Sequence, residues 1–534
     1  MKFYELNARE IASKVRSGEI KAIEVLEKTL AHIKEVDGQP GVLDGVTLSQ
    51  EEENKVHAFI EVTESLARQQ AKEVDRKVSA GEDPGLLAGV PVSIKDIFCI
   101  EGVRTTAASR ILSNFYPPYT ATTVAKLQAA GALIVGKVNL DEFTFGSSNE
   151  SSAFQPCPYN PWDPSCAVGG SSGGSGASVA AYEVPLSLGT DTGGSIRQPS
   201  AFCGVVGLKP TYGRVSRYGL IAFGSSLDCP GPLARNAGDA ALMLQVIAGL
   251  DSRDATTTVV KPSDYLAALR QDLRGMRIGL SPDYGHIAYP DFETGEVTYE
   301  PLQDEVNQAT RDAAKILARA GAEIVEGVPM PNSRFGIPAY FVISRVEAAS
   351  NLHRFDGVKY GYHTTKPVKD LNELYRLTRA EGFGNQPKLR ILMGMYVSAS
   401  QHSANYYHKA LKVRGMIRND FVQAFDKNGK YAIDLLMTPS TPTTAFKRKE
   451  VFGNTVLMQY SDQMNVCANH AGIPAVTTPA GFDARGLPLG IQFIGPEYRE
   501  DLVLRAAHGY EQATAEAAWR SRRPVVLGQG KELA

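Results

Sequence analysis

The stretch GGSSGGSGASVAAYEVPLSLGTDTGGSIR, residues 169–197, places eight glycines and six serines around a segment of core composition. Segments rich in Gly and Ser are commonly flexible linkers, but a linker has no reason to run directly into ASVAAYEVPLSLG. A Walker A phosphate loop ends in Gly-Lys-Ser/Thr, and this tripeptide does not occur here. The stretch therefore indicates a loop that presents backbone N–H groups and hydroxyls for chemistry.

The pattern Gly-x-Ser-x-Gly fits twice at the start of this stretch, which raises the nucleophile elbow of an α/β-hydrolase as an alternative. The elbow needs a strand directly before it, whereas the preceding NPWDPSCAV is a proline-containing loop. Ser195 is the stronger candidate nucleophile. Gly193 and Gly194 leave the backbone amides ahead of it unshielded, so that several N–H groups can converge on a developing oxyanion.

A base for this serine is supplied by AGVPVSIKDIF, residues 88–98, in which Lys95 follows an apolar run typical of a strand. The chain has no histidine between His57 and His286, so the local sequence offers no histidine base. Burial disfavours the charged form of lysine, and a fall of about three pKa units, roughly 4 kcal/mol, would make Lys95 a base at neutral pH. The alternative is a lysine that snorkels at the end of a strand.

Composition places the chain among large globular proteins: 534 residues, 43% hydrophobic and 21% charged. A net charge of −2 gives no basic field for binding nucleic acid directly, so any RNA is expected to be held by a partner. The six cysteines form no CxxC pair, and we expect neither a metal site nor disulfides. Without a signal peptide or a long apolar run, the expected location is the cytoplasm, with no membrane contact.

The order of secondary-structure patterns predicts an α/β fold with two parts. Residues 1–80 are expected to form a helical N-terminal arm, and residues 81–534 a single large α/β unit. In the second part, β-rich runs alternate with helical patterns, which predicts a large, mixed but mostly parallel sheet with helices on both faces. The expected helices lie near 121–130, 139–146, 173–182, 237–249 and 303–320. Two turn-rich segments, near 39–53 and 285–301, are expected to be surface insertions.

Three motifs in this order resemble the amidase signature family: GVPVSIKD, GGSSGGSGASVAA and GTDTGGSIRQPSAFCGVVGLKPT. The resemblance implies the amidase signature fold and a Ser-Ser-Lys triad. In that triad Lys95 is the base, Ser171 is a relay held by a cis peptide bond, and Ser195 forms the acyl intermediate. It also implies an oxyanion hole from the backbone amides of Thr192, Gly193, Gly194 and Ser195, and supporting polar positions at Ser172, Asp191 and Arg197.

Longer segments, among them RFGIPAYFVISRVEAASNLHRFDGVKYGYHT and PSTPTTAF, are similar to one branch of that family. It comprises the glutamine-hydrolysing A subunits of tRNA-dependent amidotransferases, and the similarity covers residues 3–38 and 54–515. The resemblance implies that the chain uses no cofactor of its own. It would release ammonia from glutamine to a B subunit that binds the tRNA and uses ATP and Mg, while a small C subunit tethers the two.

Free glutamine carries an α-carboxylate and an α-ammonium, so a selective pocket needs one cation and one anion. The resemblance assigns these roles to Arg390 in PKLRILMG and Asp462 in MQYSDQMN, with the hydroxyl of Tyr340 nearby. At Leu389 the sequence departs from the family pattern, where another basic residue is expected.

Two alternatives to the glutaminase subunit stay open. The first is a stand-alone amidase for small carboxamides, which would turn over without partners. The second is a scaffold without catalysis, which the presence of Lys95, Ser171 and Ser195 disfavours. The sequence does not decide whether Glu-tRNA(Gln), Asp-tRNA(Asn) or both would be amidated.

Overall fold

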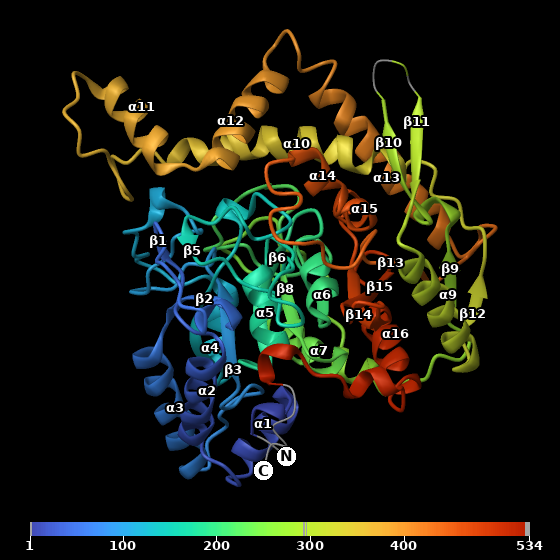
Figure 1. The fold of residues 1–534 in the computed structure, drawn as a ribbon. Coiled ribbons are helices and arrows are strands. Elements are labelled where there is room, and N and C mark those ends of the chain that lie inside the picture. Colours follow the sequence, from blue (N-terminus) through green and yellow to red (C-terminus); the bar gives the residue numbers. More distant parts are fainter. Residues whose placement is uncertain (1–2, 292–293, 295, 529–534) are drawn as a thin grey trace.

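The computed structural model describes residues 3–291, 294 and 296–528. An eleven-stranded sheet runs through its centre in the order β12-β9-β13-β15-β14-β7-β8-β6-β3-β4-β2, flanked by helices (Figure 1). These strands are β2 (Phe59–Val62), β3 (Pro91–Lys95), β4 (Leu133–Val138), β6 (Leu186–Asp191), β7 (Val206–Lys209), β8 (Cys229–Ala234), β9 (Arg277–Leu280), β12 (Glu323–Val325), β13 (Leu435–Pro439), β14 (Ala475–Phe482) and β15 (Pro488–Ile494).

Every residue of five central strands is buried, namely in β3, β4, β6, β7 and β8. The middle of the sheet is therefore covered on both faces, as in sheets that lie between layers of helices. The longer helices are α1 (Ala8–Arg16), α2 (Ala22–Val36), α3 (Glu64–Ser79), α4 (Thr122–Ala129), α5 (Gly173–Ala180), α7 (Ala237–Ile247), α9 (Asp304–Arg319), α10 (Gly336–Asn351), α11 (Leu371–Gly382), α12 (Asn385–Ser398), α13 (Tyr407–Phe425), α15 (Gln463–Ala471) and α16 (Glu500–Ala513). The shorter ones are α6 (Arg197–Cys203), α8 (Tyr265–Ala268) and α14 (Thr455–Tyr460).

The α/β class and the large mixed sheet are confirmed, but the expected excess of parallel pairs is wrong. Within the described residues, four neighbouring strand pairs are parallel and six are antiparallel. A parallel pair needs a long crossover, whereas a short loop allows an antiparallel one. The short link between β14 and β15 makes them a hairpin, and β7 reaches its neighbour β8 through a loop without a helix.

The helix expected near 139–146 is a single 3-10 turn, Glu142–Thr144, in which Phe143 has a φ of 50°. Local side-chain bonds compete with helix formation here. The Asp141 carboxylate accepts hydrogen bonds from the Asn149 N–H and from Ser151. The other four expected helices correspond to α4, α5, α7 and α9.

The described part of the N-terminal segment contains three long helices, as expected for residues 1–80. Asn7 and Glu10 form a reciprocal capping box at the start of α1. Strand β2, which precedes α3, joins the main sheet, because it pairs with β4 and completes the edge of the sheet. The boundary at residue 80 stays a prediction.

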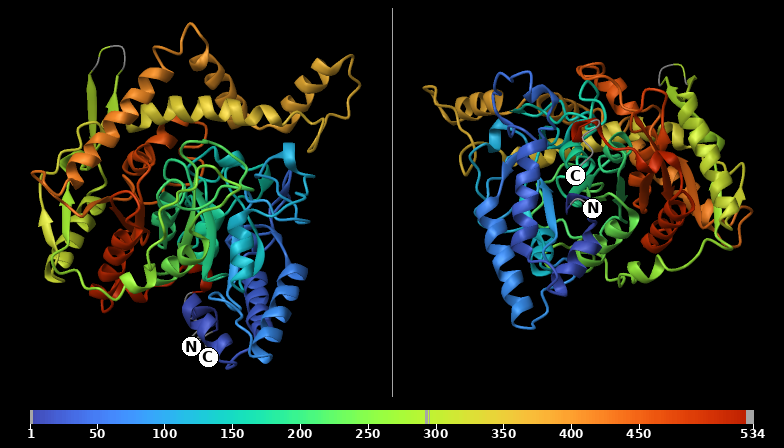
Figure 2. Two further views of the ribbon diagram at one scale, coloured as in Figure 1. Left: turned by 180° about the vertical axis from the view of Figure 1, so that it is seen from behind. Right: turned by 60° about the horizontal axis from the view of Figure 1, so that its bottom comes forward.

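Helices α10 to α13 form a separate layer across one end of the sheet, opposite α1 (Figures 1 and 2). Helix α10 crosses α12 so closely that a Cβ on Gly394 would overlap the carbonyl oxygen of Arg345. This layer carries two of the predicted pocket residues, Tyr340 and Arg390.

The two expected insertions differ in structure. Within the first, β1 (Val42–Leu43) pairs with β5 (Phe154–Gln155). The second contains an antiparallel pair, β10 (His286–Pro290) with β11 (Val297–Pro301); residues 292, 293 and 295 of this segment lie outside the described part. Among the described helices, none is long and apolar enough to cross a membrane.

Candidate active site

Lys95 is the last residue of β3, and its side chain is fully buried. Its Nζ lies 2.8 Å from the Oγ of Ser171, 2.8 Å from the Oγ of Ser172 and 2.9 Å from the Oγ1 of Thr190. The peptide bond between Gly170 and Ser171 is cis. The sheet thus carries the lysine to the point where the glycine-rich loop turns into α5, and three hydroxyls surround its amine.

Burial lowers the pKa of Lys95 to about 7. The nearby carboxylates of Asp141, Asp191 and Asp228 act in the opposite direction, but burial outweighs them. A substantial fraction of Lys95 is therefore neutral near pH 7. The snorkelling alternative is wrong, because the amine does not reach solvent.

The loop that leads into Ser195 lies against the Ser171 loop. The N–H of Ser172 donates to the carbonyl oxygen of Ser195 over 3.1 Å, and α6 begins with a bond from the Gln198 N–H to the Gly194 carbonyl. Among the described residues, no acceptor takes a hydrogen bond from the N–H groups of Gly193, Gly194 or Ser195. Three adjacent N–H groups are therefore available to a ligand, which is the requirement for an oxyanion hole.

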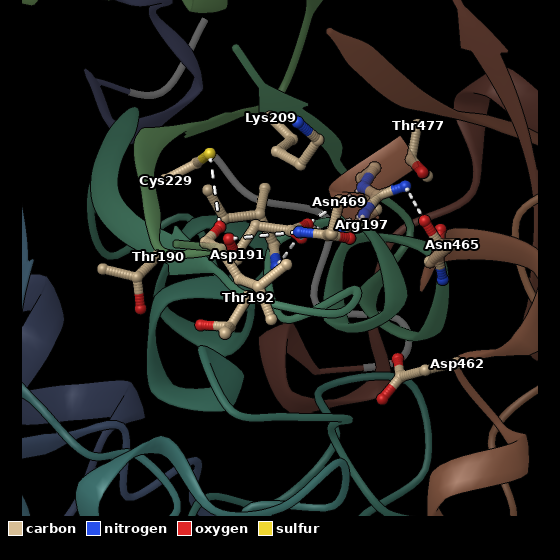
Figure 3. A network of polar contacts seen from close by, with 12 residues as sticks. Thr190, Asp191, Thr192, Arg197, Lys209, Cys229, Asp462, Asn465, Asn469 and Thr477 are labelled. Atoms are coloured by element: carbon tan, nitrogen blue, oxygen red, sulfur yellow. Dashed lines mark hydrogen bonds and ion pairs between the residues drawn. The ribbon is translucent and has the colours of Figure 1, made fainter. Parts of the chain in front are cut away.

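Asp191 and Arg197 fix both ends of this loop. The Asp191 carboxylate receives Nε and Nη2 of Arg197, each at 2.9 Å, and the side-chain amide of Asn469 at 2.8 Å (Figure 3). Burial opposes ionisation of Asp191, but the charge and hydrogen bonds of Arg197 bring its pKa to about 2. Both side chains are fully buried. The pair is a charged clamp inside the core that holds residues 191–197 in one conformation.

The first residue of the loop is held separately. Thr192 donates from Oγ1 to Asp228 over 2.7 Å, and the same carboxylate accepts the N–H groups of Phe223 and Gly224. This contact fixes the Thr192 side chain at Asp228, and the Thr192 N–H, predicted as a further oxyanion donor, also has no acceptor among the described residues. Asp228 was not among the residues that the sequence singled out.

Tyr340 and Asp462 pack directly on the two glycines before Ser195. A Cβ on Gly193 would lie 2.8 Å from the Cζ of Tyr340, and one on Gly194 would overlap Oδ1 of Asp462. Gly194 also has a φ of +150°, which favours glycine. The structure therefore brings two distant predicted pocket residues to the loop that carries Ser195.

Asp462 presents one free carboxylate oxygen. Its Oδ2 accepts a hydrogen bond from the Oγ of Ser147 over 2.5 Å, while its buried Oδ1 has no partner in the described part of the chain. Burial raises the pKa of Asp462 well above its ordinary range. An ammonium group placed at Oδ1 would favour the charged form and lower this pKa again.

Arg390 on α12 is buried and bonds to Gln386 one turn earlier, with its guanidinium 5.1 Å from the ring centre of Phe145. Burial lowers its pKa to about 10. No described carboxylate lies within 4.0 Å of it. Next to it, Leu389 and Gln386 border a cavity of about 740 Å³ whose lining does not include the predicted triad.

The structure thus brings the predicted triad residues into one region, but among the described residues it shows no hydrogen bond of the Ser195 hydroxyl. Lys95 donates hydrogen bonds to the hydroxyls of Ser171 and Ser172. Ser195 contacts this group through its carbonyl oxygen, which accepts the Ser172 N–H. Sequence reasoning missed Thr190, which lies within the quoted GTDTGGS motif, and Ser147, which has only a nearby run of polar residues as a signal.

The chain belongs to the amidase family: the family model for amidases matches residues 47–504. A relative from Carboxydothermus hydrogenoformans, the A subunit of glutamyl-tRNA(Gln) amidotransferase, is 48% identical over 514 residues, which cover 96% of this chain and 98% of that protein. The crystal structure of the protein with the same name from Thermotoga maritima has a TM-score of 0.74 at 34% identity, covering 96% of this chain and 95% of that one. The native peptide amidase of Stenotrophomonas maltophilia has a TM-score of 0.75 at 29% identity, covering 97% and 98%.

Proposed function

We propose that this chain is the glutamine-hydrolysing subunit of a tRNA-dependent amidotransferase. The observation that carries the chemistry is the buried Nζ of Lys95, 2.8 Å from the Oγ of Ser171 and with a pKa of about 7. The names of the relatives, together with their near-complete coverage of the chain, support this branch of the family over a stand-alone amidase.

In the proposed hydrolysis, each of these groups has one role. Neutral Lys95 takes a proton from Ser171, which takes one from Ser195 as the Ser195 oxygen attacks the carboxamide carbon. The N–H groups of Gly193, Gly194 and Ser195 stabilise the oxyanion of the tetrahedral intermediate. The proton returns to the leaving nitrogen, ammonia departs, and water attacks the acyl-enzyme to release glutamate and regenerate Ser195.

The pocket charges support glutamine as the substrate. The free Oδ1 of Asp462 lies against Gly194, where it can receive the α-ammonium group, and the Arg390 guanidinium can receive the α-carboxylate. A substrate that carries both an ammonium and a carboxylate gives ionic partners to Asp462 and Arg390, which are buried without such partners among the described residues.

The remaining parts of the reaction are assigned to other chains. In this proposal a B subunit binds the charged tRNA, consumes ATP with Mg and uses the ammonia, and a small C subunit joins the two, all in the cytoplasm. This chain needs no cofactor for the hydrolysis derived above, since base, nucleophile and oxyanion donors are its own residues.

The test is to purify the chain with its partner subunits and to measure ammonia release from glutamine with and without ATP and Glu-tRNA(Gln). The proposal expects glutamine hydrolysis and glutamine-dependent formation of Gln-tRNA(Gln). Turnover of small carboxamides by the isolated chain, without transfer to tRNA in the complex, would instead favour the stand-alone amidase.

A further inference from the structure

A second arginine of the helical layer, Arg345 on α10, has no assigned role and an unusual environment. Its side chain is 1% exposed, and its Nε and Nη2 have no hydrogen-bond partner among the described residues. Its Nη1 donates to the Phe341 carbonyl at 3.1 Å and to the Ser344 hydroxyl at 3.2 Å. Arginine stays protonated in proteins, so a buried positive charge is left with two free donor atoms.

The position of Arg345 connects it to the predicted glutamine pocket. Its backbone meets α12 at Gly394, one turn after Arg390. Its guanidinium lies 3.1 Å above the ring centre of Phe341, the neighbour of Tyr340. Burial and then the positive charge of Arg390 lower the pKa of Arg345 well below its ordinary value. The crossing of α10 and α12 thus brings the backbone of Arg345 to the turn of α12 that follows Arg390, and each helix carries one buried arginine there.

Both arginines lack a compensating acid in the part of the chain that the structure describes. There, no carboxylate lies within 4.0 Å of Arg345 or Arg390. Buried charges without a partner are costly inside a protein, and an anion that contacts both arginines would offset this cost. The free nitrogens of Arg345 are donors of the fork type that matches a carboxylate.

We propose that Arg345 binds the α-carboxylate of the amino-acid substrate together with Arg390, and thereby selects amides that carry a carboxylate. A carboxylate has about four lone-pair sites on its two oxygens, so two guanidinium groups can share it. The inference rests on the proposed function and deepens it. The site binds glutamine in preference to analogues without a carboxylate, because the guanidinium groups of Arg345 and Arg390 both bind the α-carboxylate.

The experiment measures binding apart from catalysis. In the complex with Ser195→Ala, which cannot form the acyl intermediate, calorimetry gives the Kd of L-glutamine and of L-glutaminamide, which lacks the carboxylate charge. Adding Arg345→Met should weaken L-glutamine about tenfold and leave L-glutaminamide unchanged, as expected for loss of a charge-assisted hydrogen bond. Arg345→Lys should recover part of the affinity, because it keeps the charge but not the fork.

Two controls separate this role from a structural one. Arg376→Met removes an arginine of α11 that is 69% exposed and should change neither Kd. The ligand-free Tm of Arg345→Met should equal or exceed that of the parent, because an uncompensated buried charge is removed. Unchanged glutamine affinity, or equal weakening of both ligands with or without a lowered Tm, would overturn the proposal. Failure of the proposed function would show separately, as absence of ammonia release from glutamine when Ser195 is intact.

Discussion

Replacing Lys95 by arginine tests the central feature of the site, a lysine that burial keeps neutral. With a pKa of about 7, half of Lys95 is neutral at pH 7. With the ordinary value of about 10.5, only about one molecule in 3,000 would be neutral. Because only the neutral amine can accept a proton, the buried position raises the active fraction by roughly a thousandfold.

Arginine retains the positive charge and hydrogen-bond donors but cannot accept the proton. We therefore expect Lys95→Arg to lose at least about a thousandfold in kcat/KM for glutamine, similar to Lys95→Ala, because members of a triad act as a unit. The assay is ammonia release across pH 5.5 to 9. The wild-type rate should fall about tenfold per pH unit below pH 7, as Lys95 becomes protonated, and level off above it.

The matched control is Lys137→Arg on the neighbouring strand β4. Lys137 is equally buried, and its Nζ forms an ion pair with Asp96 at 2.6 Å that a guanidinium can keep. Its kcat/KM should stay within a few-fold of wild type, with the Tm of both variants measured to exclude unfolding. A Lys95→Arg enzyme within tenfold of wild type, or one with the same inflection near pH 7, would refute the role of Lys95 as the base.

Three further substitutions test the nucleophile, the loop and the pocket. Ser195→Ala should abolish glutamine hydrolysis and any acyl adduct detected by mass spectrometry on this chain; retained activity would exclude Ser195 as the nucleophile. Gly194→Ala should lower kcat by about 10²-fold or more, since the added Cβ overlaps Asp462 and displaces the oxyanion donors; a normal kcat would show that these N–H groups do not act. Arg390→Ala or Asp462→Ala should cost about ten- to a hundredfold in kcat/KM for glutamine, while ammonium chloride still supports tRNA amidation; equal loss with both nitrogen sources would point to a folding or assembly defect.

The sequence predicted those parts of the site that depend on local pattern. Lys95 follows an apolar run that forms β3, and the glycines at 193 and 194 leave N–H groups free. Both features follow from burial and from the lack of a side chain, which are properties of a few adjacent residues. The triad assignment additionally needed the resemblance, because no local pattern connects Ser171 with Lys95.

What the sequence left open depends on contacts between distant segments. Tyr340 and Asp462 reach the same loop because α10 packs against α15, whose N-cap residue is Asp462. The free nitrogens of Arg345 likewise depend on its burial in the folded chain, and a single arginine in a helical pattern gives no sign of it. Four of the six antiparallel pairs were missed for a similar reason, since they join strands that are not consecutive in the chain.

The clamp between Asp191 and Arg197 links the shape of the site to its chemistry. Asp141, Asp191 and Asp228 all lie close enough to raise the pKa of Lys95 and so to make it a worse base, and the last two also hold the oxyanion loop. Asp191 is neutralised by the Arg197 guanidinium at 2.9 Å, and the charge of Asp228 is spread over Thr192 and two backbone N–H groups. Partners that hold the oxyanion loop in place thus also weaken the field that would protonate the base. Positioning the donors and keeping Lys95 neutral are two results of the same contacts.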